Sequence, residues 1–311
     1  MKTLKQKIAN YATQDLGLDD CRFTSADTSQ FMEIYDLWLK AGRHGEMDYL
    51  LKHQDLKEHP EKLLSGVRSA IVVMKNYKST HERRLAGNFK IARYAVGADY
   101  HAILAEKLNA LADVLKKESP QAQCYCGVDS RPIPERSLGI QAGVGFLGKN
   151  TMLIKPGMGS YFYLGVVLTT VDFEPDAPLR WDCGSCRLCI DACPTQALLG
   201  DFQMDAAKCI SYQTIEQKEP MSETQIRQAQ GWIYGCDICQ EVCPYNHDRI
   251  PLTNWSEFLP EAGVGFKFFE KAPDDLKEQD IPKTSPMHRS RRRIIPNFQL
   301  ARRIESAKMK H

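Results

Sequence analysis

The chain has 311 residues, and its 41 lysines and arginines nearly balance its 39 aspartates and glutamates. The formal net charge of +2 therefore produces no strong global field. No apolar run reaches the ~18 residues of a membrane span, and the first residues lack the apolar core of a signal peptide. We expect a cytoplasmic protein of about two domains at ~150 residues each, with no membrane partner, for which a monomer would suffice.

Hydrophobic periodicity predicts mixed helices and strands before the cysteine-rich segment. In chain order we expect helices over 1–18, 28–42 and 101–117, and strands over 70–74, 124–128 and 161–171. The second helix is expected to bury Phe31, Ile34, Tyr35 and Trp38. These strands and helices do not alternate regularly as βαβ units, so the α+β class is favoured over a doubly wound sheet.

A glycine-rich segment, Gly143 to Asn150, resembles two nucleotide-binding patterns. A helix is expected before it and a strand after it, which is the reverse of the order that dinucleotide binding needs. Asn150 also lacks the hydroxyl that a phosphate loop uses for magnesium. We expect these glycines instead to let the backbone approach a large flat ligand closely.

Eight of the eleven cysteines fall in one segment that opens Cys-x-x-Cys-x-x-Cys-x-x-x-Cys-Pro. This is the bacterial ferredoxin spacing, in which three cysteines bind one [4Fe–4S] cluster and the fourth binds the other. Structural zinc usually takes two Cys-x₂₋₄-Cys pairs and fits less well. The predicted ligands are Cys183, Cys186, Cys189 and Cys243 for cluster one, and Cys193, Cys209, Cys236 and Cys239 for cluster two. The other three, Cys21, Cys124 and Cys126, are expected to be free thiols in or near the core.

A proline-rich linker at 174–178 suggests three parts: a domain over 1–177, a ferredoxin-like module over 178–249, and a basic, helical C-terminal segment over 250–311. The last part contains the run Arg291, Arg292 and Arg293. Arginines suit phosphate contacts because the guanidinium matches phosphate oxygens. A charge run is also often only a solvated face, and the residues leave both interpretations open.

Two polar residues of the first domain, considered on their own, are expected to have structural roles. Asp129 follows the strand expected over 124–128, where an aspartate most often serves a turn. His101 is expected to start the helix over 101–117, because its surroundings do not form the D-x-H-x-x-G pattern of cobalamin proteins that supply a histidine to cobalt.

Several segments, in order and together with the two-cluster module, resemble the epoxyqueuosine reductases, which are cobalamin-dependent iron–sulfur enzymes of tRNA modification related to reductive dehalogenases. The resemblance covers about residues 40–250, in the segments 45–49, 92–95, 99–101, 128–130, 148–152, 209–216 and 235–244. It implies an N-terminal domain that binds cobalamin, with cob(II)alamin as the resting state. It also implies reduction of epoxyqueuosine to queuosine at the wobble position in queuosine-family anticodon loops, by cob(I)alamin fed by two [4Fe–4S] clusters and an external electron donor.

The resemblance further assigns roles to single residues. Asp129 matches the proton donor, and such a donor would need a raised pKa, which burial beside the corrin ring would provide. Lys218, with the three tail arginines, becomes a candidate for tRNA contact. The implied cofactor contacts are Arg93, Tyr94, Asp129, Lys149, Asn150, Ser160, Ser211 and Asp237. The alternative is a cobalamin and iron–sulfur reductase of small molecules, of the reductive-dehalogenase type.

Overall fold

The computed structural model describes residues 3–80, 89–200, 202–247, 250–262 and 275–308. Its α-helices are α1 (Leu4–Asn10), α2 (Ser29–Lys40), α3 (Asp48–Lys52), α4 (Gln54–Glu58), α5 (Tyr100–Glu118), α6 (Glu135–Gln141), α7 (Leu188–Asp191), α8 (Ile210–Ile215), α9 (Glu223–Gln228), α10 (Ile238–Glu241) and α11 (Arg291–Lys308). Its strands are β1 (Asp20–Ser25), β2 (Ser69–Asn76), β3 (Lys90–Ile91), β4 (Cys124–Gly127), β5 (Phe146–Leu147), β6 (Leu153–Ile154), β7 (Phe162–Thr169), β8 (Leu198–Gly200), β9 (Gln203–Met204) and β10 (Trp232–Tyr234). Within the described residues, no helix is both long and apolar enough to cross a membrane.

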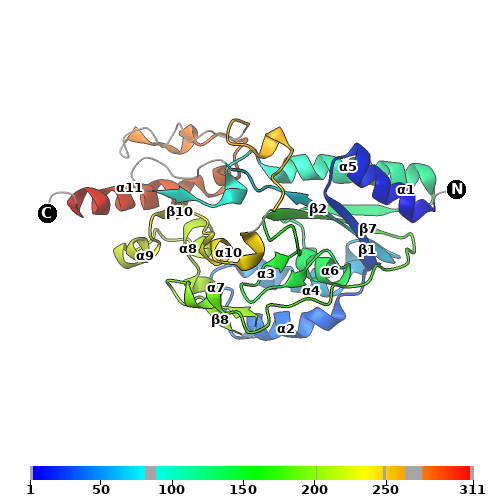
Figure 1. The fold of residues 1–311 in the computed structure, drawn as a ribbon, viewed down its shortest axis with the longest axis horizontal. Helices are drawn as coiled ribbons and strands as arrows, with labels where there is room; N and C mark the ends of the chain where they lie inside the picture. Colours follow the sequence, from blue (N-terminus) through cyan, green and yellow to red (C-terminus); the bar gives the residue numbers. More distant parts are fainter. Residues whose placement is uncertain (1–2, 81–88, 201, 248–249, 263–274, 309–311) are drawn as a thin grey trace.

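The first part of the chain is built on a four-stranded antiparallel sheet in the order β1-β2-β7-β4 (Figure 1). The two central strands, β2 and β7, pair along their whole length, from Ser69 opposite Thr169 to Asn76 opposite Phe162. Both are rich in β-branched and aromatic residues, which suit a pleated and buried surface. The predicted strands over 70–74 and 161–171 are confirmed, as is the α+β class.

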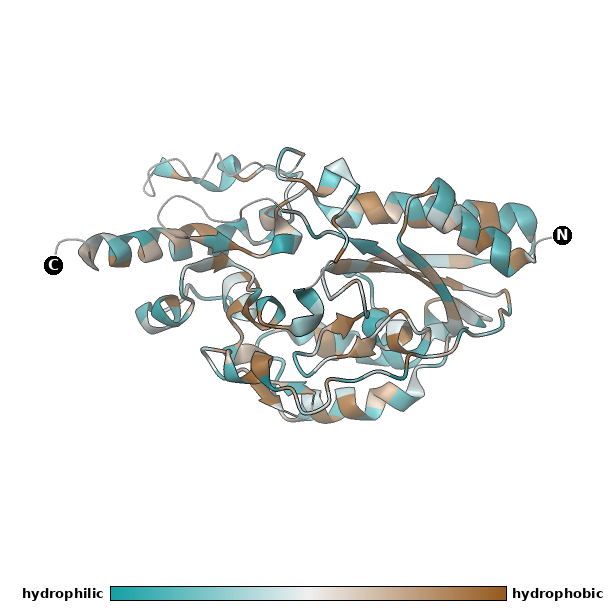
Figure 2. Ribbon diagram, viewed as in Figure 1, coloured by the Kyte–Doolittle hydropathy of each residue, from teal (hydrophilic) through white to brown (hydrophobic). Residues whose placement is uncertain are grey.

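Helices cover both faces of this sheet, with α1 and α5 on one side and α6 on the other (Figure 1). Because successive strand residues point to opposite faces, Ile71 and Val73 of β2 pack toward α5, whereas Val72 and Met74 pack toward α6. In Figure 2, hydrophobic residues recur along the strands of this sheet. The predicted helix over 101–117 is confirmed as α5, and its four aligned leucines are buried.

The buried face expected for the second helix is wrong. Ile34 is 63% exposed, and the buried side chains of α2 are Met32 and Leu39. The indole Nε1–H of Trp38 donates to the backbone oxygen of Met204 at 2.7 Å. The helix is therefore oriented partly by a contact with the distant β8–β9 hairpin, which its own periodicity does not reveal.

A third hydrophobic core joins the cluster module to the C-terminal segment. It contains residues of β10, α8, α9 and α11, and β10 pairs in parallel with β3. Phe89 and Ile91 from the first part of the chain pack into this core. The helical C-terminal segment is confirmed as α11. The boundaries at 177 and 249 stay a prediction.

The glycine-rich segment follows α6 and precedes β6, in the expected order. Gly143 has a φ of +74°, and a Cβ there would lie 2.2 Å from the backbone oxygen of Ala177. A Cβ on Gly145 would lie 2.7 Å from the backbone oxygen of Ile154. The backbone that approaches these two glycines belongs to the protein itself, so for them the expectation of a flat ligand is wrong.

Candidate functional site

Cys183, Cys186, Cys189 and Cys243 surround a small cavity of about 40 Å³. The backbone N–H of Lys149 donates to the Cys183 sulfur at 3.4 Å. The Lys149 ammonium donates to the backbone oxygens of Gly184 and Cys186 at 2.6 and 3.0 Å. A backbone donor and a cation beside the sulfurs suit an anionic iron–sulfur cluster.

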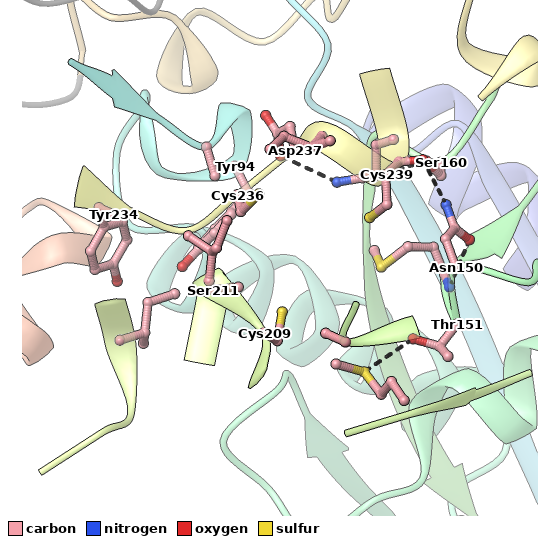
Figure 3. A pocket seen from close by; sticks show the side chains of 18 of the residues that line it. Tyr94, Asn150, Thr151, Ser160, Cys209, Ser211, Tyr234, Cys236, Asp237 and Cys239 are labelled. Carbon is pink, nitrogen blue, oxygen red and sulfur yellow. Dashed lines mark hydrogen bonds between the residues drawn. The ribbon is translucent and has the colours of Figure 1, made fainter. Parts of the chain in front are cut away.

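The other four predicted ligands, Cys193, Cys209, Cys236 and Cys239, line a second and larger cavity. Figure 3 shows Cys209 and Cys239 reaching into it from separate segments. The backbone N–H of Ala197 donates to the Cys193 sulfur at 3.3 Å. The cysteines of each predicted group thus line one cavity. Among the described residues, no three histidine, cysteine or acidic side chains are arranged to hold a metal ion, so the assignment of the cluster ligands stays a prediction.

The larger cavity has a volume of about 550 Å³, and its wall is rich in aromatic and aliphatic side chains. Such a wall suits a large organic cofactor, because binding sites of this size are mostly apolar with a few placed polar groups. Of the residues predicted to contact a cofactor, Arg93 and Lys149 lie outside its lining. The ones in the lining are Tyr94, Asp129, Asn150, Ser160, Ser211 and Asp237.

Three of these polar side chains are already bound to protein partners. The Asp237 carboxylate accepts the backbone N–H of Arg93 at 2.8 Å, and the Ser160 hydroxyl donates to the Gln240 amide oxygen at 2.8 Å. The Asn150 amide donates to the backbone oxygen of Cys239 at 3.4 Å. These bonds join the sheet and its loops to the cluster module, so they fix the shape of the cavity wall.

Asp129 lies where β4 ends and the first turn of α5 meets the cavity. Its Oδ2 accepts a hydrogen bond from the Tyr100 hydroxyl at 3.0 Å and lies 3.1 Å from the His101 Nε2. The His101 Nδ1 lies 2.6 Å from the Oδ1 of Asp99, the N-cap of α5. The Asp129 side chain is 61% exposed and opens onto the cavity, whereas His101 is only 13% exposed behind it.

The electrostatics of this group place the proton on the imidazole. Burial alone would lower the pKa of His101, but the hydrogen bonds to Asp129 and Asp99 outweigh it and raise that pKa above its usual value. Although the Asp129 side chain is open to the cavity, the protein around that cavity partly desolvates it, which would raise its pKa; the hydrogen bond and charge of His101 outweigh this and lower that pKa. In the protein without a bound cofactor the pKa of Asp129 is therefore lowered and not raised, because the expectation considered the cavity and not the imidazole beside the carboxylate.

Three members of this site were not predicted from the sequence. His101 starts a helix as expected, but it also contacts Asp129, 28 positions away. Tyr100 and Glu135 line the same cavity. One sequence feature could have indicated them, namely three adjacent polar or aromatic residues at a helix start, Asp99, Tyr100 and His101. A helix N-terminus that packs on the end of a strand can bring such side chains close to a neighbouring loop.

The predicted nucleic-acid residues are dispersed. The Lys218 ammonium lies 3.3 Å from the Asp48 carboxylate. The guanidinium groups of Arg291 and Arg292 each lie 3.5 Å from the Glu278 carboxylate, and Arg293 donates to the backbone oxygen of Ile215 at 2.9 Å. Arg289, in the same basic run, lines the large cavity, with its guanidinium nitrogen 3.4 Å from the His101 Nε2.

Comparisons with known proteins identify the family. Residues 57–130 match the model described as epoxyqueuosine reductase QueG, DUF1730. An epoxyqueuosine reductase of Leadbetterella byssophila is 37% identical over 268 residues, which cover 85% of this chain and 86% of that protein. This chain belongs to the epoxyqueuosine reductase family. A second relative, from a Synechocystis species, is 40% identical over 230 residues, covering 73% of this chain and 78% of that protein.

As a member of this family the chain is an oxidoreductase, and its residues 182–246 match a 4Fe–4S double cluster binding domain. Solved epoxyqueuosine reductases share the fold. One was crystallised with an epoxyqueuosine-modified stem loop of tyrosine tRNA; it has a TM-score of 0.82 at 30% identity, with 96% of this chain and 80% of that chain covered. Another, from Bacillus subtilis, has a TM-score of 0.81 at 29% identity over the same shares, and its catalytic aspartate loop is swung out of the active site.

Proposed function

We propose that this protein reduces epoxyqueuosine to queuosine in tRNA, with cobalamin in the large cavity and electrons supplied through two [4Fe–4S] clusters. One observation carries the proposal: a single cavity is lined by the four thiols of the second cysteine group and by Asp129. A redox centre and an acidic group thus face the same space. Family membership and the relative bound to a modified stem loop support this substrate over the small molecules of the alternative.

The reaction needs both features. Converting an epoxide to an alkene consumes two electrons and two protons, breaks both carbon–oxygen bonds and releases the oxygen as water. Iron–sulfur clusters deliver electrons singly, and bound cobalamin, when reduced, supplies a nucleophilic metal able to deliver two electrons to carbon. Because only the second cysteine group lines the cavity, electrons from an external donor would enter through cluster one and reach the cavity through cluster two.

The aromatic wall would hold the corrin ring. Tyr94 and Tyr234 line this wall together with Ser211 (Figure 3). Asn150, Ser160 and Asp237 would act mainly by keeping the wall in place through the bonds described above. Arg93 and Lys149 would act indirectly, through Asp237 and through the loop of cluster one.

Asp129 would deliver a proton to the departing oxygen, and the His101 imidazolium would be the source of that proton. The His101 Nε2–H donates to the Asp129 carboxylate, which is the member of the pair that opens onto the cavity. Asp99 accepts the Nδ1–H and stabilises the imidazolium. His101 would first transfer its Nε2 proton to the Asp129 carboxylate, and the carboxylic acid so formed would donate this proton to the substrate oxygen. Solvent would supply the second proton. General acid catalysis of this kind contributes about 10²–10⁴ in rate.

The substrate nucleotide must leave the stack of the anticodon loop to reach this cavity, which is how proteins usually read single-stranded RNA. Arg136 and Arg289 line the cavity and suit the flanking phosphates. Lys218 and the arginines at 291–293 would contact the stem loop farther out. Binding should weaken as salt concentration rises.

Anaerobic reconstitution tests the proposal. The purified protein, assembled with iron, sulfide and cobalamin, should show the spectra of both cofactors. With a chemical reductant it should remove one oxygen atom from the modified nucleoside of an epoxyqueuosine stem loop, as measured by mass spectrometry. A protein that takes up both cofactors but neither binds nor deoxygenates the stem loop contradicts the proposal and favours a small-molecule substrate.

A further inference from the structure

Asp129 sits in a backbone conformation that needs support. Its φ is +48°, in the left-handed region that non-glycine residues seldom adopt. The next two residues, Ser130 and Arg131, are exposed. Packing at Ile133, which is 4% exposed, holds the far side of this loop. The conformation of Asp129 itself decides whether its carboxylate meets His101.

A carboxyl group from the start of α6 contacts the backbone at this position. The N–H of Asp129 donates to the Glu135 Oε1 at 2.6 Å. Glu135 lines the same cavity, close to Lys57, Arg136 and Tyr100. Burial and the negative charge of Asp129 raise the pKa of Glu135 to about 8. Near neutral pH its carboxyl is therefore largely protonated, and its carbonyl oxygen remains free to accept the N–H.

We propose that Glu135 is a positioning residue, which accepts the Asp129 N–H and keeps the Asp129 carboxylate directed at His101 and the cavity. The catalytic part of this inference rests on the proposed role of Asp129. The structural part does not, since it concerns the conformation of the loop. A charge effect of Glu135 on Asp129 is the competing explanation, and it requires the negative charge where the proposal requires only the oxygen.

Two substitutions separate these explanations. Glu135→Gln keeps the length and the acceptor oxygen but removes the ionisable group. Glu135→Asp keeps the ionisable group but shortens the side chain by one methylene, so the oxygen no longer reaches the Asp129 N–H. Glu223→Asp, on the exposed first turn of α9, is the matched control for that shortening.

Two readouts apply to the reconstituted protein. Hydrogen–deuterium exchange of the peptide containing 128–133 reports the loop, and steady-state turnover of the epoxyqueuosine stem loop reports catalysis. For Glu135→Asp we expect faster exchange in this peptide and a kcat lower by about 10–10²-fold with little change in KM, because a misplaced catalytic group costs rate more than binding. Glu223→Asp should resemble the unaltered protein in both readouts. Glu135→Gln should keep the slow exchange of this peptide and lose clearly less kcat than Glu135→Asp, because its acceptor oxygen remains.

Three results would contradict the positioning role of Glu135. Unchanged loop exchange in Glu135→Asp overturns it, and so does a Glu135→Gln variant that loses as much as Glu135→Asp. Loss in Glu135→Gln alone also overturns it and assigns a charge effect. Failure of the proposed function would appear differently, as absence of turnover in the unaltered protein, while the exchange measurement would still test the contact.

Discussion

At the scale of single residues, the site depends on the contact between Asp129 and His101. The sequence around either residue does not reveal this contact. Asp129 after a strand and His101 at a helix start have ordinary structural explanations, and the sequence supports those first. The structure places the carboxylate 3.1 Å from the imidazole and shifts the two pKa values apart. Groups whose pKa values are separated by their surroundings are the usual acid and base of an active site.

Replacement of His101 by glutamine should lower turnover and change its dependence on pH. Without the imidazolium, Asp129 has no adjacent proton store, so we expect kcat to fall by about 10²-fold, at the lower end of the range for general acid catalysis. In the unaltered protein, activity should be high below the folded-state pKa of His101 and fall as pH rises through it. That descent should be absent in His101→Gln. A variant with the same pH profile as the unaltered protein would show that His101 does not supply the proton.

The same pair also links stability to pH. The folded-state pKa of His101 lies above its usual value near 6.5. Its contribution to the free energy of unfolding should therefore be fully present below pH 6.5 or so and lost as pH rises through the folded-state pKa. Denaturant titrations of the unaltered protein and His101→Gln across this window should converge at high pH.

At the scale of elements, long periodic segments were predictable and orientation was not. The α5 helix was predictable because four leucines at helical spacing mark one face, and β2 and β7 because β-branched runs mark buried strands. The face of α2 was not, since its Trp38 bonds to a hairpin more than 160 positions away. Likewise, the cysteine spacing predicted two groups, whereas the cavity that the second group shares with Asp129 arises only from packing of the module against the sheet.

Truncation of Leu108 should test the importance of α5 for the fold. Leu108 is fully buried and packs on the sheet that ends at Asp129. Leu108→Ala should lower the free energy of unfolding by about 2–5 kcal/mol, because it removes buried methyl groups and leaves a cavity. The matched control Ile34→Ala, at an exposed position, should change it by less than about 0.5 kcal/mol. Equal losses in the two variants, measured by denaturant titration, would contradict the packing described here.

At the scale of the whole molecule, the cluster module is fixed to the sheet by buried polar contacts. Ser160, just before β7, bonds to both Gln240 and Asn246 of the module. Gly159 before it has a φ of +70°, and a Cβ there would lie 2.1 Å from the Asn246 side chain. The two cysteine groups and the cavity therefore lie in parts of the protein that are held together, which would suit the proposed electron transfer over a fixed distance.

Loss of one ligand should separate the two clusters. Cys209→Ser should reduce iron content by about half, because two clusters of four irons become one. It should also abolish turnover, since the predicted ligands of cluster two line the cavity. Cys124→Ser, in β4 and outside both cysteine groups, should retain full iron content. Iron and acid-labile sulfide assays provide the measurement. Unchanged iron content in Cys209→Ser would show that Cys209 is not a ligand.

The most direct test of the central claim is a single-turnover measurement on the Asp129→Asn variant. Asparagine tolerates the left-handed backbone conformation and keeps the size of the side chain, but it cannot carry the proton. The anaerobically reconstituted variant should bind cobalamin and the epoxyqueuosine stem loop normally and form queuosine at least about 10²-fold more slowly than the unaltered protein. Queuosine formation at the unaltered rate would contradict the account of this site.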